Sequence, residues 1–267
     1  MSRWALLAFF ATRIAFADEA GDLFARGNDA LVQGKPNDAI AAFEALADRG
    51  ITDASLSFNR GLSYATRVRI NAGQPGDVGR AIHGFEEARS LSRDRELVRA
   101  AESALLLLRG EVARKQVSRG ASMEVDRPAP LGRTLSSALA ERTWNFICIL
   151  SSIFFAVAIV ARHRLGERGR LGAVIAGSLL VPCWGYTCTM SELAARNRTS
   201  RKEAVVIVEN LRLAAEQGAP LTSGEGLPEG ARVEVISTRD GWSFVEWGRS
   251  KGSVPIGALR LVAAEGL

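Results

Sequence analysis

The chain has 267 residues, a formal net charge of +5 and an apolar content of 47%. A chain of this length is expected to form about two domains, and two apolar runs leave soluble parts that are each too short for a large enzyme. The excess of positive charge comes mostly from arginines beside these runs, where basic residues bind lipid phosphate and set membrane orientation. We therefore expect membrane lipids as partners and no nucleic acid.

Residues 1–17 are predicted to form a secretory signal peptide. Arg3 precedes an apolar stretch, and a small-x-small tripeptide over residues 15–17 comes just before the acidic Asp18, which is the pattern of a signal cleavage site. Because Arg13 interrupts the apolar part, an ordinary buried N-terminal helix is the alternative. If the signal is real, the chain from Asp18 onward is exported.

Residues 18–122 show helical spacing of apolar and small residues in two similar stretches, separated by an insertion over residues 71–79. The two sets are Leu23, Gly27, Ala30, Ala39, Phe43 and Leu46, and then Phe58, Gly61, Tyr64, Ala81, Phe85 and Ala88. This order of Gly, Tyr, Ala, Phe and Ala resembles the tetratricopeptide repeat. The resemblance implies a helical solenoid whose concave surface binds a peptide.

Four polar residues are candidates for that peptide-binding surface. In the repeat family an asparagine of the first helix often contacts the ligand, and Asn28 and Asn59 fall at such positions. Arg95 and Arg99 lie one helical turn apart and could face an anionic ligand. The alternative is that all four are merely solvated polar positions.

A linker is expected over residues 123–143, followed by apolar runs at residues 144–161 and 171–190. A helix of either length spans roughly 27 to 30 Å, the thickness of a hydrocarbon core, and neither run contains a charged residue. The segment between them, residues 162–170, holds four arginines. We therefore predict a two-helix transmembrane hairpin with this segment in the cytoplasm and both flanking parts outside.

All three cysteines, Cys148, Cys183 and Cys188, lie in the two apolar runs. The exported parts therefore have no disulfide to stabilise them. Cys148 could form a bridge with Cys183 or with Cys188, or the three could be small residues that let the helices pack closely. The sequence leaves these alternatives open.

After a short stalk over residues 191–203, residues 204–267 alternate between apolar and polar residues in the manner of short strands. Turns are expected at residues 229–230, at 240–241 and at Gly248. The segments Gly230–Val235, Asp240–Trp242 and Gly252–Pro255 resemble the bacterial SH3 domain, although Ser253 stands where that family commonly has a Trp. The resemblance makes Trp242 the candidate for a ligand-binding face and leaves Trp247, which alternation places on the opposite face, for the core.

Catalytic and metal-binding chemistry is not indicated. The chain has two histidines, His83 and His163, and neither has other ligands at metal spacing. Phosphate-loop, dinucleotide and hydrolase motifs are missing, and Glu44, Glu86 and Glu87 occupy positions expected on solvated helix faces. We therefore expect no enzymatic activity, no catalytic residue, no metal and no cofactor.

Taken together, this order of modules resembles the BatE-type proteins of bacterial aerotolerance operons. The expected fold class is a multidomain membrane protein with an α-helical TPR-like solenoid, a two-helix transmembrane hairpin and a small all-β SH3-like barrel. The resemblance implies a scaffold in an envelope complex, with protein partners such as membrane proteins that carry von Willebrand A domains, and a MoxR-type ATPase encoded nearby.

The expected function is that of a non-enzymatic adaptor of the bacterial inner membrane. It would cross the membrane twice and hold two protein-interaction modules on the extracytoplasmic side, so that two weak contacts reinforce each other. The alternative is an envelope sensor whose SH3-like domain binds cell-wall peptides.

Overall fold

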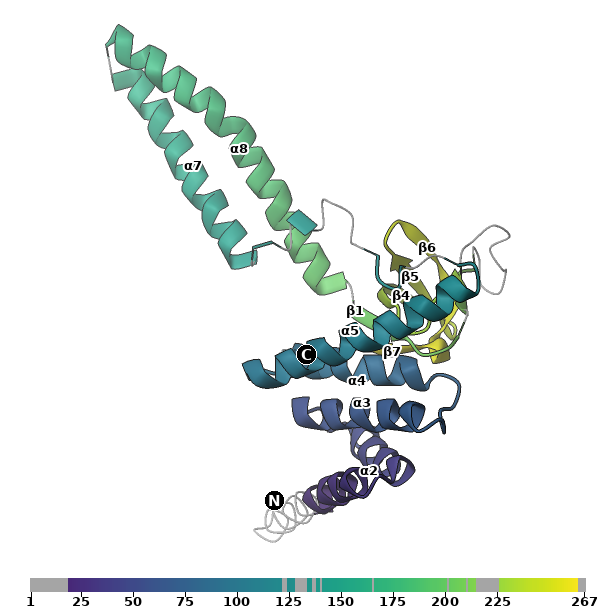
Figure 1. Cartoon of the computed structure of the whole chain (residues 1–267). Helices are drawn as coiled ribbons and strands as arrows, with labels where there is room; N and C mark the ends of the chain where they lie inside the picture. Colours follow the sequence, from purple (N-terminus) through teal and green to yellow (C-terminus); the bar gives the residue numbers. More distant parts are fainter. Residues whose placement is uncertain are drawn as a thin grey trace, which may run out of the picture. The chain divides into compact units, whose positions relative to one another are not determined.

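Two compact units make up the chain, one formed by Met1–Arg127 with Lys202–Leu267 and the other by Pro128–Arg201 (Figure 1). A long insertion therefore divides the first unit in sequence. The expected signal peptide, residues 1–17, lies outside the described residues. The computed structural model describes residues 19–121, 124–127, 134–135, 138–139, 141–164, 166–200, 202–209, 211–214 and 226–263.

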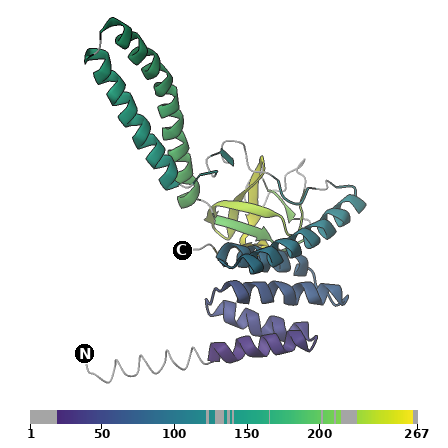
Figure 2. The same cartoon turned by 60° about the vertical axis from the view of Figure 1, so that its left-hand side comes forward.

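A row of helices forms the N-terminal part of the first unit, with neighbours in sequence packed side by side (Figure 2). Asp53 caps α3 by accepting hydrogen bonds from two backbone amides of its first turn, and Asp94 caps α5 in the same way with one amide. Such caps satisfy donors that a helix start leaves unpaired. The helices are residues 19–32, α2 (Pro36–Asp48), α3 (Ala54–Arg69), α4 (Asp77–Leu91) and α5 (Arg95–Ser118).

The C-terminal part of the first unit is a five-stranded antiparallel sheet with the order β6-β5-β4-β1-β7. Asp240 and Gly241 join β4 to β5, and both have positive φ, as a two-residue hairpin turn requires. The strands β2 (Leu211–Arg212) and β3 (Gly226–Leu227) form a separate two-stranded ladder, and a single bridge between Ala214 and Ser253 of β6 links it to this sheet. The five strands are β1 (Lys202–Val206), β4 (Arg232–Arg239), β5 (Trp242–Trp247), β6 (Ser250–Pro255) and, after the short helix η1 (Ile256–Ala258), β7 (Leu259–Leu261).

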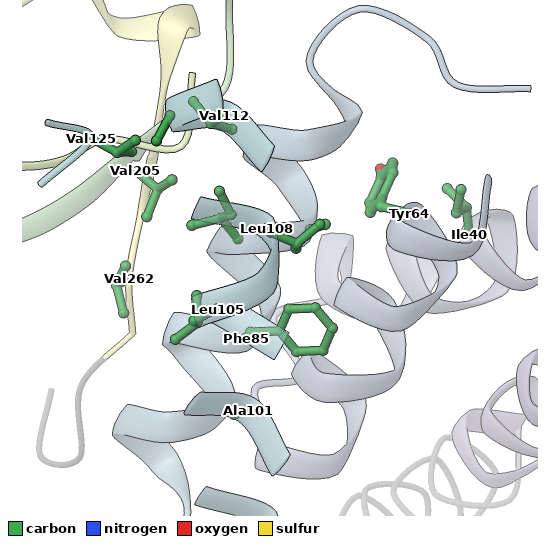
Figure 3. Close-up of a cluster of buried hydrophobic side chains, with 13 residues drawn as sticks. Ile40, Tyr64, Phe85, Ala101, Leu105, Leu108, Val112, Val125, Val205 and Val262 are labelled. Atoms are coloured by element: carbon green, nitrogen blue, oxygen red, sulfur yellow. The ribbon is translucent and has the colours of Figure 1, made fainter. Parts of the chain in front are cut away.

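The helices and the sheet share a hydrophobic core. Val205 of β1 and Val262 just after β7 are buried in the same cluster as Phe85 of α4 and Leu105 of α5 (Figure 3). The backbone approach is close, because a Cβ added at Gly79 of α4 would lie 2.5 Å from the carbonyl oxygen of Val206. The two segments on either side of the insertion are therefore one folded body, hereafter the helix–sheet unit.

The second unit contains α7 (Glu141–Arg164) and α8 (Glu167–Ser200), which lie side by side (Figures 1 and 2). Within the described part of the chain, one helix is long and apolar enough to cross a membrane by length and composition, namely Arg142–Arg164. Only 12% of its most apolar window is buried by the protein. Large apolar side chains of α7 are exposed instead, namely Phe146, Ile149, Leu150, Ile153, Phe154, Val157, Ile159 and Val160.

The expected fold class is wrong. The sheet ends at β6 and β7, and no ladder joins these edge strands in the described residues, so it does not close into the expected SH3-like barrel. The helix row does not continue as a free solenoid, because α4 packs against β1. The expected transmembrane hairpin is also not supported. Among the described residues α7 alone meets the criteria for a span, and α8 runs over 34 residues, beyond the predicted second run.

Candidate functional site: a polar cluster between the helices and the last strand

A cavity of about 240 Å³ lies where α2, α3 and α4 meet β7. Charged side chains from both parts of the helix–sheet unit reach it, although they are separated by more than 170 residues in sequence. The residues that form this polar cluster are Glu44, Arg60, His83, Glu87 and Arg260, with the backbone of Leu261.

The most buried ion pair of the cluster joins α3 to α4. Arg60 Nη2 lies 2.6 Å from Glu87 Oε2, and both side chains are 7% exposed. Ser57 Oγ donates to the same carboxylate oxygen at 2.7 Å, and the backbone amide of Ala263 donates to the other at 3.3 Å. Arg60 Nε is buried and has no hydrogen-bond partner in the described structure. The guanidinium therefore depends on Glu87 for charge compensation.

His83 connects this ion pair to the end of β7. Its Nε2 lies 2.8 Å from the carbonyl oxygen of Leu261, which can only accept, so Nε2 carries the proton. Nδ1 is then free to accept from Arg60 Nη2 at 3.3 Å. Burial lowers the pKa of His83, and although the Glu87 charge and the Leu261 hydrogen bond oppose this, the net direction is downward. The native state therefore holds this imidazole neutral.

The stability of the helix–sheet unit should fall as the pH drops below about 6.5, the unperturbed pKa of histidine. On acidification the unfolded chain binds a proton at residue 83 before the native state does, so protonation favours unfolding. The expected result is a lower urea midpoint at roughly pH 5 than at roughly pH 7, followed by tryptophan fluorescence of the detergent-solubilised protein. In His83→Gln this part of the pH dependence should be lost, and an unchanged slope would contradict the assignment.

A second ion pair ties α2 to β7. Arg260 Nη1 and Nη2 each lie 2.8 Å from one oxygen of Glu44, and the hydroxyl of Tyr64 donates to Oε1 of this carboxylate at 2.8 Å. Burial alone would raise the pKa of Glu44, but the hydrogen bonds and charge of Arg260 outweigh it and lower the pKa. Burial and the adjacent Glu44 charge raise the pKa of Tyr64 to about 12. The carboxylate is thus ionised and the phenol neutral near pH 7.

The polar cluster couples elements that are far apart in the chain. Glu44 holds Arg260, and Arg60 holds Glu87, so each of these charges is compensated inside the unit. Glu44 of α2 binds Arg260 of β7. On α4, His83 binds the carbonyl of Leu261 and Glu87 accepts from the amide of Ala263. Both ring nitrogens of His83 are engaged in hydrogen bonds, which favours a structural role for the cluster, holding α2, α3 and α4 to β7, over a role in proton transfer.

The structure brings together two of the four residues predicted for a peptide-binding surface. Asn59 Nδ2 of α3 donates to Asn28 Oδ1 of the first helix, residues 19–32, at 2.8 Å. Arg95 and Arg99 are exposed one turn apart on α5, whose helical neighbour is α4. The asparagine pair and the arginine pair therefore belong to different helices, and whether any of the four binds a peptide stays a prediction.

The two tryptophans of β5 differ in burial. Trp247 is 2% exposed, and its indole nitrogen donates to the carbonyl of Val125 at 3.3 Å, while the Arg127 guanidinium lies 4.0 Å from the ring centroid. Trp242 is half-buried at the start of the strand. Ser253 of β6 pairs with Phe244 and is buried. Trp242 is thus the tryptophan of β5 that a ligand could reach.

Sequence reasoning missed the polar cluster. Glu86 and Glu87, expected on a solvated helix face, are 2% and 6% exposed. Glu86 is paired with Arg89 one turn away and with Arg109 of α5. The sequence around His83 offers only the small residues Gly79, Ala81 and Gly84 as a local signal, whereas Arg260 and Leu261 lie more than 170 residues further along the chain.

The chain was compared with known protein families, with curated protein sequences and with solved structures. None of the three comparisons finds a match. The resemblance to BatE-type proteins therefore stays a prediction from the sequence.

Proposed function

We propose that this protein is a non-enzymatic scaffold of the bacterial inner membrane that binds protein partners through its helix–sheet unit. The observation that carries the proposal is the exposed apolar surface of α7, which the protein itself leaves uncovered. Removing one large apolar side chain from water is worth about 1.5–3 kcal/mol. An apolar surface of this extent on a helix long enough to span a bilayer favours contact with lipid.

The fold also limits how the protein can be oriented. The chain enters the second unit after Arg127 and returns to the first at Lys202, and both of these residues belong to the helix–sheet unit. Both segments of that unit must therefore lie on one side of the membrane, so α7 does not cross it as a lone span and contacts the bilayer from that side. If the predicted signal peptide exports the N-terminal segment, this is the extracytoplasmic side, where partners in the membrane or periplasm are available.

The exposed face of α5 is the surface we assign to a protein partner. Arg95, Arg99 and Leu106 follow one another at spacings of four and seven residues, which places them on one side of the helix. Leu106 is 77% exposed and the adjacent Leu107 68%. Exposed leucines beside arginines are suited to an amphipathic partner segment with acidic residues.

Membrane attachment and partner binding can be tested separately. The full-length protein should stay with membranes in alkaline carbonate and be released by mild detergent. Replacing Ile153 and Val157 of α7 together with lysine should reduce retention, since a charge in the hydrocarbon core costs up to about 3 kcal/mol. Leu106→Lys, a matched exposed position on α5, should leave retention unchanged and reduce the recovery of co-purifying protein.

Two outcomes would contradict the proposal. Release of the parent protein from membranes by alkaline carbonate would show that it is not inserted in the bilayer. Recovery of the bare polypeptide alone in mild detergent, with no difference between the parent and Leu106→Lys, would remove the scaffold role.

A further inference from the structure

Two of the three cysteines lie opposite each other in the second unit. Cys148 of α7 and Cys188 of α8 have their Sγ atoms 2.8 Å apart, and both residues are half-buried. We infer that these two thiols form a disulfide between α7 and α8 in the exported protein, and that Cys183 stays a free thiol. The inference rests on the extracytoplasmic orientation of the proposed function.

The alignment of the two helices is supported on both sides of the thiol pair. Ser191 Oγ donates to Asn145 Oδ1, and Trp184 Nε1 donates to Ser152 Oγ at 2.8 Å. From Asn145 to Cys148 to Ser152 the steps along α7 are three and four residues, and their partners step back along α8 by the same amounts. Successive turns of two antiparallel helices thus meet in register, which brings both cysteines to the shared face.

Cys183 is not positioned to pair with Cys148. It lies five residues before Cys188 on the same helix, which at 3.6 residues per turn is about 140° around the axis. It is exposed, whereas the other two cysteines are half-buried. Geometry therefore selects Cys188 over Cys183 as the partner of Cys148.

A redox partner from the aqueous phase could reach this pair. Trp144 of α7 and Tyr186 of α8 make an edge-to-face ring contact with centroids 6.2 Å apart, four and two residues from Cys148 and Cys188 respectively. Aromatic residues of this kind concentrate at the membrane–water interface. The thiols thus lie near the surface of the bilayer and not at its centre.

The reaction is thiol–disulfide exchange with the disulfide of an oxidised dithiol protein. One of the two cysteines attacks that disulfide as a thiolate and forms a mixed disulfide, and the second cysteine then displaces the partner's sulfur. One S–S bond forms and one breaks. The two protons and two electrons lost by Cys148 and Cys188 leave with the partner as two thiols. Such exchange proceeds in oxidising compartments and is suppressed in the cytosol.

Counting free thiols in the full-length protein tests the inference. Cells are quenched with acid, and thiols in the denatured protein are labelled with a maleimide polymer that slows migration in a gel. We expect one adduct without reduction and three after reduction. Cys183→Ser should give none without reduction, and Cys148→Ser should give two. Peptide mass spectrometry should find residues 148 and 188 joined.

Three adducts without reduction, or a bridge that includes Cys183, would overturn the inference. A second measurement then shows which premise failed. Isolated membranes, opened to both sides, are treated with oxidised glutathione: formation of the bridge between residues 148 and 188 would mean that the pairing is right and the orientation of the proposed function is wrong. No bridge under these conditions would mean that the pairing itself is wrong.

Discussion

Replacing Arg60 with methionine is expected to lower the free energy of unfolding of the helix–sheet unit by about 3–5 kcal/mol, the loss that follows when one partner of a buried ion pair is removed. The substitution removes the charge partner of the Glu87 side chain, which is 7% exposed, and leaves it only Ser57 and the amide of Ala263 as donors. The expected readout is a lower urea midpoint of the detergent-solubilised full-length protein, with unchanged slope.

A surface ion pair provides the control for this substitution. Arg239 and Asp240 lie 3.3 Å apart, but their side chains are 84% and 70% exposed. Arg239→Met should change stability by less than about 1 kcal/mol. Combining Arg60→Met with Glu87→Met should recover part of the loss, because an apolar pair no longer strands a buried charge. Equal effects of Arg60→Met and Arg239→Met would show that the Arg60 pair is not buried as described.

Gly84→Ala should be strongly destabilising, whereas Gly110→Ala should be neutral or stabilising. A Cβ at Gly84 of α4 would lie 2.7 Å from the Cα and amide nitrogen of Gly61 and 2.7 Å from the carbonyl of Ser57, so the backbones of α3 and α4 would have to separate. Overpacking of this kind costs about 1–3 kcal/mol and sometimes more. At Gly110 of α5 an added Cβ meets nothing within 4 Å, and Ala is favoured over Gly in a helix by about 1 kcal/mol.

The paired variants are compared by thermal or urea unfolding under one set of conditions. Opposite signs are the expected result, since the chemical change is the same and only the surroundings differ. An effect at Gly84 as small as that at Gly110 would mean that α3 and α4 do not approach as the structure describes. The same comparison tests the position of the polar cluster, because Ser57 and Glu87 lie in the same pair of helices.

Local periodicity was enough to find most of the secondary structure. The spacing of Phe43 and Phe85 with their small neighbours placed α2 and α4, and the Asp240-Gly241 pair placed the turn between β4 and β5. These features depend on residues three or four apart in a helix and on two-residue turns, so a short window of sequence contains them.

The assembly of the elements did not follow from such windows. Alternation in the last 60 or so residues predicts strands but does not say whether the sheet closes, and the edges at β6 and β7 stay unpaired with each other in the described structure. The polar cluster depends on contacts such as that between Glu44 and Arg260, which are 216 residues apart. No pattern of composition or spacing encodes contacts over that distance, which is why Glu44 was assigned to a solvated helix face.

The participation of β7 in the polar cluster has a consequence for biogenesis. Arg260 follows Glu44 by 216 residues and Leu261 follows His83 by 178, so Glu44 and His83 have to wait for these partners while the ribosome adds the residues between them. During that interval the surface of α4 that later covers β1 is open, and Ile82 and Phe85 lack part of their final surroundings. A nascent chain in this state is a natural substrate for chaperones, and premature termination before residue 259 would leave it there permanently.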